Sequence, residues 1–468
     1  MEDIAEYAMK LCRECDYAEV RVEKSTDEGF LLKNSVLDLA SFDQAEGMAV
    51  RVLDKGSLSF VSTNRLEKDD VKKAVEKAIK IARASRKLIK EPIEFSEEKM
   101  FEDNILVKAK KSNESMSHED KIAFLKRIDR AIINLPFKVP MRQLSFSASH
   151  EKKLFVNSEG ANIKAEFPRT SFLWFITVAE KQKTKQKYLS YNLTKGLEAL
   201  DEWKLDSTIV EQAKALHNNL VNGIKPPKEE IDLVLGPEVV GITVHESTGH
   251  PYEADRILGR EAAQAGESFV TRDMLKTKIG AEIVNVSEDP TLEGSSGFYL
   301  YDDEGVKARK RQLIKNGNIN EFLNNRQTAK TLGIKSNASA RAVSFQREPI
   351  VRMANTFMEP GDWEKDEIIQ ETKKGIYIKN FMEWNIDDKR YNQKYVGAEA
   401  YLIKNGEICE PVVNPAIEVT TPAFYSAINA IAKDVELFAG TCGKGEPMQG
   451  IPVSMGGPTI RLSGLRVR

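Results

Sequence analysis

Two of the five histidines in this 468-residue chain stand close together, as His245 and His250 in the segment His-Glu-Ser-Thr-Gly-His. Imidazole nitrogens are zinc ligands, and a carboxylate beside them can take a proton from a water on the metal. This spacing corresponds to about 140° around an ideal helix, whereas ligands four residues apart share one face. Gly249 loosens the backbone and Pro251 disfavours helical geometry at His250, so a distorted last turn can bring the rings together. The motif predicts a metal site with Glu246 as proton acceptor; a hydrogen-bonded pair of surface histidines is the alternative.

The segment before this motif indicates how it is positioned. Residues 231–235 form an apolar run typical of a buried strand, and Gly236 follows it. Pro237 suits the first position of a helix, because the N–H that proline lacks would have no partner there. We therefore expect the two histidines at the frayed end of a short helix that follows a buried strand.

A catalytic zinc needs a third protein ligand and an open position for water. Glu253 and Asp255 lie just downstream of the histidines, and Cys442 lies near the C-terminus in Gly-Thr-Cys-Gly-Lys. The flanking glycines leave the Cys442 thiol accessible and Lys444 favours its thiolate form, although a packed small hydrophobe is the alternative. The remaining cysteines and histidines fit a metal site less well: Cys12, Cys15, Cys409, His118, His150 and His217.

Composition excludes several classes of protein. Sixty-nine basic and 71 acidic side chains leave a net charge of -2, without the basic excess on which binding to nucleic acid or an anionic membrane depends. Four cysteines are too few for a disulfide scaffold and suit a reducing compartment. No apolar run approaches the ~18 residues that span a bilayer, and the acidic start Met-Glu-Asp lacks the features of a signal peptide. We expect a cytoplasmic protein that binds neither nucleic acid nor membrane.

The first half of the chain predicts two successive units, each with a helix, a meander of strands and a second helix. Apolar residues at helical spacing indicate helices over 3–15, 71–82, 207–220 and after a cap at Ser117. Alternating or apolar runs indicate strands at 17–22, 29–42, 47–53, 57–61, 141–149, 153–157, 161–167, 171–180 and 187–192. The charged segment 86–116 is interpreted as a surface connection between the units.

A domain boundary is predicted at residues 225–230, Lys-Pro-Pro-Lys-Glu-Glu, because neither a helix nor a central strand tolerates the Pro-Pro pair. Beyond it, short strand-like runs are broken by frequent glycine and proline. We expect an α+β fold in which N-terminal helix–meander units precede a β-rich C-terminal domain that carries the metal site. The predicted domains are an α/β subdomain at 1–90, a helix–meander–helix subdomain at 117–224 and the metal-site domain at 229–468.

Several segments of the C-terminal half resemble, in order, the motifs of the TldD/PmbA family of metalloproteases, also called modulators of DNA gyrase. They are the histidine segment extended to Asp255, Tyr-Asp-Asp-Glu-Gly at 301–305, Arg-Met-Ala-Asn-Thr at 352–356, and the terminal Gly-Thr-Cys-Gly-Lys at 440–444 with Gly-Pro-Thr-Ile-Arg at 457–461. The N-terminal half is similar in layout and length only. The chain carries His-Glu-x-x-x-His, so it resembles the catalytic TldD-like branch rather than the PmbA/TldE-like partners that lack this motif.

The resemblance implies that His245, His250 and Cys442 bind Zn²⁺ and that Glu246 is the general base. It also implies a cytosolic peptidase that trims short or unfolded peptides and works as a dimer around an enclosed cavity. The partner is either a second copy or a motif-less PmbA/TldE-like paralogue.

The predicted function is therefore peptide-bond hydrolysis by a metal-activated water. The substrate backbone is expected to pair with an exposed strand edge. Asn355, Arg341 and Arg352 are polar residues that can hold peptide carbonyls or a terminus, with purely structural roles as the alternative. Two other functions stay open: a regulatory or scaffold subunit with a structural metal, and a metal-dependent hydrolase of a non-peptide amide.

Overall fold

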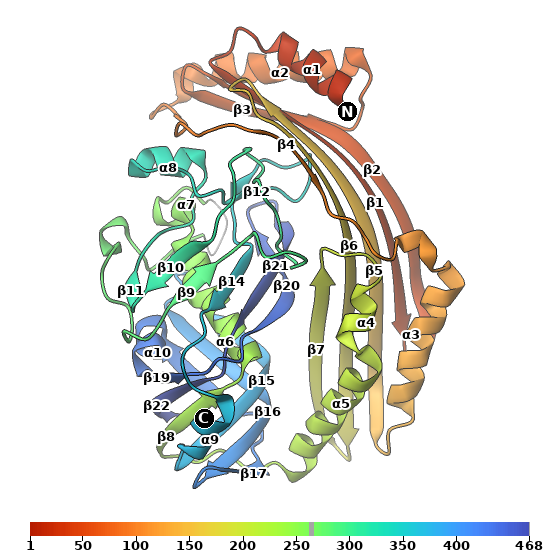
Figure 1. The fold of residues 1–468 in the computed structure, drawn as a ribbon, viewed down its shortest axis with the longest axis vertical. Coiled ribbons are helices and arrows are strands. Elements are labelled where there is room, and N and C mark those ends of the chain that lie inside the picture. Colours follow the sequence, from red (N-terminus) through yellow and green to blue (C-terminus); the bar gives the residue numbers. More distant parts are fainter. Residues whose placement is uncertain (262–265, 468) are drawn as a thin grey trace.

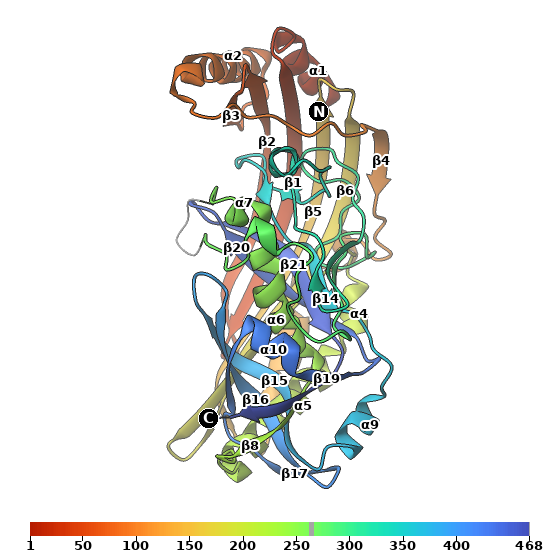
Figure 2. The same cartoon turned by 90° about the vertical axis from the view of Figure 1, so that its left-hand side faces the viewer.

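The computed structural model describes residues 1–261 and 266–467 and has two parts (Figure 1). One part is a long, strongly curved sheet with helices at one end and on its outer face. The other is a β-rich body on the concave side of that sheet, as the view turned by 90° also shows (Figure 2). This architecture confirms the predicted α+β class. Among the described residues, no helix combines the length and apolar character needed to cross a membrane.

The N-terminal part is built on one sheet with the strand order β3-β2-β1-β5-β6-β4, and β7 pairs with β6. Its strands are β1 (Tyr17–Lys33), β2 (Val36–Asp54), β3 (Ser57–Thr63), β4 (Glu102–Leu106), β5 (Lys138–Asn157), β6 (Asn162–Glu180) and β7 (Lys183–Leu193). Its helices are α1 (Glu2–Leu11), α2 (Lys68–Ser85), α3 (His118–Ile133), α4 (Ala199–Trp203) and α5 (Leu205–Asn222), with short turns η1 (Arg86–Leu88) and η2 (Asn113–Ser115).

Successive side chains along a strand point to opposite faces of a sheet, and this explains how the N-terminal sheet packs on both faces. On β6, Phe172, Trp174 and Ile176 are buried in one apolar cluster with residues of α3 and α5. The intervening Leu173 faces the other way and borders side chains of the C-terminal part. The sheet therefore has helices on its outer face and the β-rich body on its inner face.

The strands are longer than the sequence predicts. β1 continues through the polar residues 23–28, where the sequence predicts a break, because its backbone pairs with β2 on one side and β5 on the other. Backbone hydrogen bonds satisfied on both sides tolerate polar side chains. The predicted surface connection 86–116 contributes the edge strand β4, which runs parallel to β6. The first helix ends at Leu11 rather than at residue 15.

The pairing of β1 with β5 joins the two predicted N-terminal units, residues 1–90 and 117–224, in one sheet. One apolar cluster lies beneath α1 and α2 and another beneath α3 and α5, and each also includes residues from the other unit. We retain the division into three domains, with the third at 229–468, as a proposal.

The C-terminal part contains two larger sheets, with the orders β11-β10-β9-β14-β21-β20 and β17-β16-β15-β8-β22-β19, and β18 pairs with β16. Its strands are β8 (Glu230–Leu235), β9 (Val286–Glu288), β10 (Arg311–Lys315), β11 (Asn318–Ile319), β12 (Ala340–Arg341), β13 (Ile350–Val351), β14 (Asn355–Met358), β15 (Lys374–Ile386), β16 (Asn392–Lys404), β17 (Glu407–Pro411), β18 (Ala416–Thr420), β19 (Ile428–Ile431), β20 (Glu436–Lys444), β21 (Gln449–Gly457) and β22 (Ile460–Arg466). Its helical segments are α6 (Pro237–Val244), η3 (His245–Gly249), η4 (His250–Tyr252), α7 (Ala254–Ile257), η5 (Arg272–Met274), α8 (Arg326–Leu332), α9 (Lys365–Gln370) and α10 (Thr421–Ala427).

Helix α6 lies between these two sheets. It packs on β20 and β21 of one sheet and on β15 of the other. Val239, Val240 and Val244 are fully buried, as expected for a helix that is apolar on all sides. The helix follows the buried strand β8 and begins at Pro237, as the sequence predicts. It fixes the start of the histidine segment in the interior of the C-terminal part.

Candidate metal centre

The histidine segment is a distorted continuation of α6. Residues 245–249 form one π-helical turn, and the His250 N–H donates to the His245 carbonyl. Hydrogen bonds between residues five apart are the mark of this wider turn, which is frequent at functional sites. The five-residue spacing therefore brings the two rings together, with centroids 5.0 Å apart. A 3-10 turn that contains Pro251 follows, so the predicted distortion of the last turn is confirmed.

The backbone at Gly249 lies so close to the Met353 side chain that only a glycine fits there. A Cβ added to Gly249 would lie 1.8 Å from the Met353 sulfur. Met353 is itself fully buried, so its side chain has little space into which to move. The glycine thus allows the π-helical turn to pack against the segment between β13 and β14 that carries Met353.

We expect Gly249→Ala to destabilise the protein by ~1–3 kcal/mol, the usual cost of overpacking a buried site, and to lower its zinc content. Thermal unfolding and metal analysis measure the two effects. In the double variant with Met353→Ala, which removes the overlapping atoms, the combined cost should be smaller than the sum of the single costs. Additive costs together with normal zinc binding would show that this contact does not shape the site.

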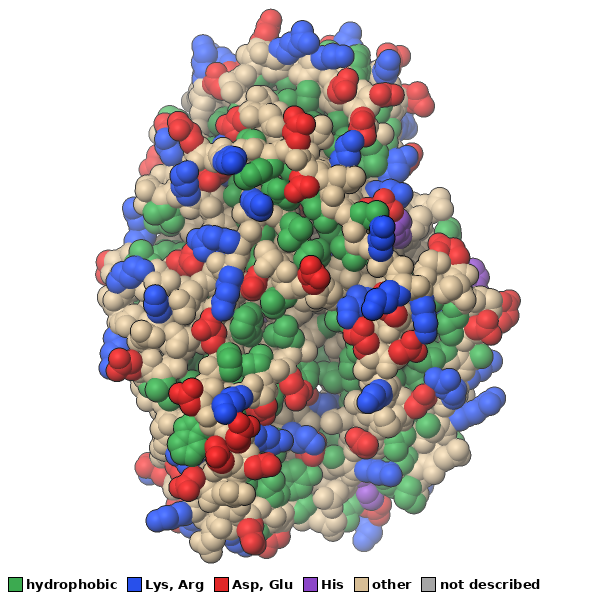
Figure 3. Space-filling view, in the orientation of Figure 1, with side chains coloured by type: hydrophobic (Ala, Val, Ile, Leu, Met, Phe, Trp, Pro, Cys, Tyr) green, Lys and Arg blue, Asp and Glu red, His purple; other side chains and the backbone are tan. Residues whose placement is uncertain are grey.

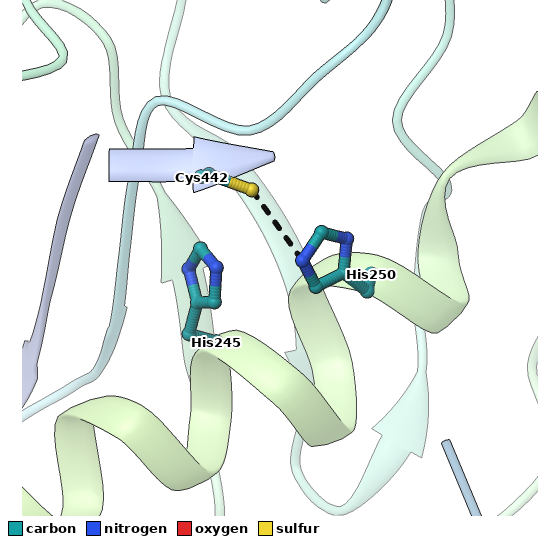
Figure 4. A group of neighbouring side chains, drawn as sticks. All are labelled: His245, His250 and Cys442. Carbon is teal, nitrogen blue, oxygen red and sulfur yellow. Dashed lines mark hydrogen bonds between the residues drawn. The ribbon is translucent and has the colours of Figure 1, made fainter. Parts of the chain in front are cut away.

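Cys442 reaches the two histidines from β20. Its sulfur lies 3.4 Å from Nε2 of His250, and one ligand atom from each of His245, His250 and Cys442 lies within 4.8 Å of the others (Figure 4). All three residues are buried. The structure thus brings together three side chains from two segments that are 192 residues apart.

The other two candidate ligands point into a supporting network. Glu253 accepts from Arg256 Nε at 2.7 Å and lies 3.2 Å from Nδ1 of His250. Asp255 accepts from Lys444 Nζ at 2.7 Å. Burial alone would raise the pKa of Glu253, but Lys444, Arg256 and His250 hold it well below its usual range. An ionised Glu253 on Nδ1 orients the His250 ring and leaves Nε2 facing Cys442, the arrangement common around metal-binding histidines.

The properties of His245, His250 and Cys442 fit a zinc ion. Two imidazoles and a thiolate are ligands that zinc takes, and three protein ligands leave a position open. Nδ1 of His245 is buried without a hydrogen-bond partner among the described residues, and such an atom is costly unless something binds it. Burial lowers the pKa of His245 and so favours its neutral form. Burial raises the pKa of the Cys442 thiol, but His250 and Arg352 lower it to about 7.

Glu246 is buried beside the histidines and is held by a residue that the sequence analysis missed. Its Oε2 accepts from Arg390 Nη1 at 2.7 Å. Burial alone would raise the pKa of Glu246, but His250, His245 and Arg390 lower it. Arg390 lies at the turn between β15 and β16 with a positive φ of 64°, 144 residues from Glu246. No motif or spacing in the sequence signals that contact.

The three predicted substrate-binding residues all contact the main chain. Arg352 is fully buried and donates to the carbonyls of Cys442 and, at 2.8 Å, Gln449. The Asn355 amide donates to a carbonyl at 2.7 Å and accepts from a backbone N–H at 3.0 Å. Arg341 donates to two carbonyls at 2.6 and 3.0 Å and also lines a separate cavity of about 310 Å³. Arg352 supports the strand that carries Cys442, and substrate binding by the three residues stays a prediction.

The remaining cysteines and histidines lie away from this centre. Cys12 is buried in the apolar cluster of α1 and α2, where burial raises its pKa to about 12. The other histidines lie on the N-terminal part, each with Nε2 within 3.0–3.4 Å of a carboxylate: His118 beside Glu28, His150 beside Glu166 and His217 beside Glu180.

Known proteins match this chain over almost its whole length. Models of three domains of the PmbA/TldA metallopeptidases match it: domain 1 at residues 18–82, the central domain at 111–217 and the C-terminal domain at 228–468. A metalloprotease of Methanocaldococcus jannaschii is 31% identical over 452 residues, which are 97% of each chain. A zinc metalloprotease TldD homolog of Saccharolobus solfataricus is 27% identical over 423 residues, which are 90% of each chain.

Solved structures share the fold. A protein described as a modulator of a DNA gyrase, from Thermotoga maritima, has a TM-score of 0.80 at 16% identity, and the match covers 100% of both chains. TldE from Thermococcus kodakarensis has a TM-score of 0.73 at 19% identity, covering 100% of this chain and 99% of its own. The three domain models and the 31% identical relative show that the chain belongs to the PmbA/TldD family of metallopeptidases.

Proposed function

We propose that this protein is a zinc-dependent peptidase that cleaves short or unfolded peptides. The observation that carries the proposal is the meeting of His245, His250 and Cys442 within 4.8 Å, with the carboxylate of Glu246 next to them in the chain. The names of the relatives support a metalloprotease, and one of them specifies zinc. A zinc ion held by these three ligands would lower the pKa of a water and polarise the scissile carbonyl.

Glu246 is the proposed general base. A base has to be ionised when the attacking water arrives, and the pKa of Glu246 is lowered despite its burial. Its carboxylate takes the proton from the water and then delivers it to the leaving amine. Arg390 keeps the carboxylate in place through its Nη1.

The edge strand β20 is the proposed track for the substrate backbone. It lies at the end of its sheet and carries Cys442, so a peptide that pairs with it passes the site. Strand addition uses main-chain hydrogen bonds and therefore makes little demand on substrate sequence. Arg352 supports this track by donating to the Cys442 carbonyl. Arg341 donates to the Pro452 carbonyl of the neighbouring strand β21 and borders a cavity. Contacts of Asn355, Arg341 and Arg352 with peptide carbonyls or a terminus stay part of the proposal.

We further propose a dimer that shields the site, formed with a second copy or with a motif-less PmbA/TldE-like paralogue. The fold shared with TldE supports such a pairing. A cytoplasmic location agrees with four cysteines that are all free. Basic and acidic side chains are interspersed on the face shown in Figure 3, which fits a protein that binds no nucleic acid.

A shielded site predicts a difference between native and unfolded substrates. The same test protein should resist cleavage when folded and be cut when denatured, because a folded chain cannot enter an enclosed cavity. Digestion of one protein in both forms, followed by electrophoresis, measures this. Equal digestion of both forms would contradict an enclosed site.

Two other functions can be separated from this proposal. One is a regulatory or scaffold subunit with a structural metal, and the other is a hydrolase of a non-peptide amide. Unfolded peptides and small non-peptide amides should be assayed side by side with the zinc-loaded protein. We expect cleavage of peptides only; cleavage of amides alone would favour the second alternative, and no cleavage of either would favour the first.

A further inference from the structure

An apolar pocket of about 260 Å³ opens directly beside His245 and Glu246. Side chains of both parts of the molecule line it: Leu173 of β6, Phe381 and Trp384 of β15, Phe438 of β20, and Val453 and Met455 of β21. We call this space the apolar pocket. A group bound there lies next to the residues that carry the proposed reaction.

The size of the apolar pocket suits one side chain. Sites for whole small molecules usually have volumes of about 300–1,000 Å³, which is more than this pocket offers. Because the pocket lies beside Glu246, a group that occupies it belongs to a molecule held at the reaction site. A side chain of the peptide that is being cut meets both conditions.

The chemistry of the walls selects an apolar occupant. Two carboxylates line the pocket, and each has a cationic partner. Glu238 accepts from the buried Lys187 Nζ at 2.6 Å, and Glu246 accepts from Arg390 Nη1 at 2.7 Å. Neither carboxylate therefore offers a free charge to a basic side chain. A charged side chain would lose its water between largely apolar walls without gaining a free counter-ion, which is unfavourable.

The apolar pocket is also reachable. It shares five lining residues with a second cavity of about 420 Å³ that lies between β7 and β20: Leu189, Ser190, Glu238, Phe438 and Ala439. The space-filling view shows the surface hollowed between the two parts of the molecule (Figure 3). An extended peptide along β20 can therefore bring a side chain into the pocket while its remaining residues stay in the larger cavity.

We propose that the apolar pocket binds a large aromatic or aliphatic side chain of a residue that flanks the scissile bond. This inference rests on the proposed peptidase function and narrows its substrates. Unfolded peptides are then cut next to residues such as phenylalanine or leucine, while the backbone pairing remains independent of sequence.

The test compares two unfolded peptides that differ only in a central phenylalanine or alanine. In an apolar pocket even one missing methylene lowers kcat/KM by about 10–200-fold, so we expect the alanine peptide to be cut at least ~100-fold less efficiently. Leu173→Trp fills the pocket from β6 and should abolish this preference. Thr177→Trp is the matched control: it adds the same ring on the same strand, outside the pocket lining, and should leave the preference intact.

Binding to the metal-free protein separates this inference from the proposed function. By calorimetry, the phenylalanine peptide should bind at least ~10-fold more tightly than the alanine peptide, and Leu173→Trp should remove the difference. If no peptide is cut but this difference persists, the peptidase proposal fails and the pocket stands. If wild type cuts and binds both peptides equally, the pocket inference is overturned and the peptidase proposal stands. Should Leu173→Trp fail to fold, Leu173→Ala widens the pocket and should shift the preference from leucine toward tryptophan; an unchanged preference would overturn the inference.

Discussion

In the variant Glu246→Gln, peptide hydrolysis should fall by ~100-fold or more while zinc content and thermal stability stay close to those of the wild type. Glutamine keeps the size of the side chain but cannot accept a proton, and loss of a general base typically costs 10²–10⁴-fold in rate. The metal should remain because the three proposed ligands are other residues, which lie within 4.8 Å of one another. Rates on an unfolded peptide, metal analysis and thermal melting measure the three quantities.

Glu359→Gln is the matched control for this substitution. Glu359 is a partly buried carboxylate of the same part of the molecule, and it accepts from Ser287 at 2.6 Å. Its replacement should leave the rate unchanged. If Glu246→Gln loses its zinc, then Glu246 is a ligand and its assigned role is wrong. If the variant keeps both its zinc and full activity, Glu246 has no part in the reaction.

Replacement of Cys442 by alanine should have the second large effect. With only His245 and His250 left, we expect zinc affinity to fall by more than ~100-fold, beyond the 10–100-fold that loss of an outer partner of a metal ligand costs. Peptide hydrolysis should disappear at zinc concentrations that saturate the wild type. Competition with a chromogenic chelator measures the affinity, and thermal melting shows whether the variant still folds.

Cys409→Ala is the control, because the Cys409 sulfur makes one weak contact, 3.5 Å from a carbonyl on its own strand β17. It should bind zinc like the wild type. Normal zinc content and activity in Cys442→Ala would remove the cysteine from the site and leave the donor set incomplete.

Local signals in the sequence predicted the segment that carries the histidines. The apolar strand, Pro237 and the glycine before His250 each act on neighbouring residues, so β8, α6 and the distorted turn could be expected. The five-residue spacing indicates a departure from an ideal helix. It does not indicate that a single π-helical turn accommodates the two histidines, as the structure shows.

Long-range contacts were beyond such reasoning. Cys442 stood out through its flanking glycines and through the resemblance to a family, whereas Arg390 sits in an ordinary charged hairpin turn. Its contact with Glu246 exists because two elements 144 residues apart pack together. The sequence does not predict the edge strand β4 for a related reason. Its pairing with β6 depends on tertiary packing and not on an alternating pattern of its own.

We propose that a zinc ion held by His245, His250 and Cys442 is essential for the hydrolysis of peptides. The most direct measurement follows zinc content and cleavage of one unfolded peptide in the same sample, before chelation, after chelation and after zinc is returned. We expect one zinc per chain, loss of cleavage when the zinc is removed, and recovery of cleavage in proportion to the zinc returned. Undiminished cleavage by protein from which all metal has been removed would contradict it.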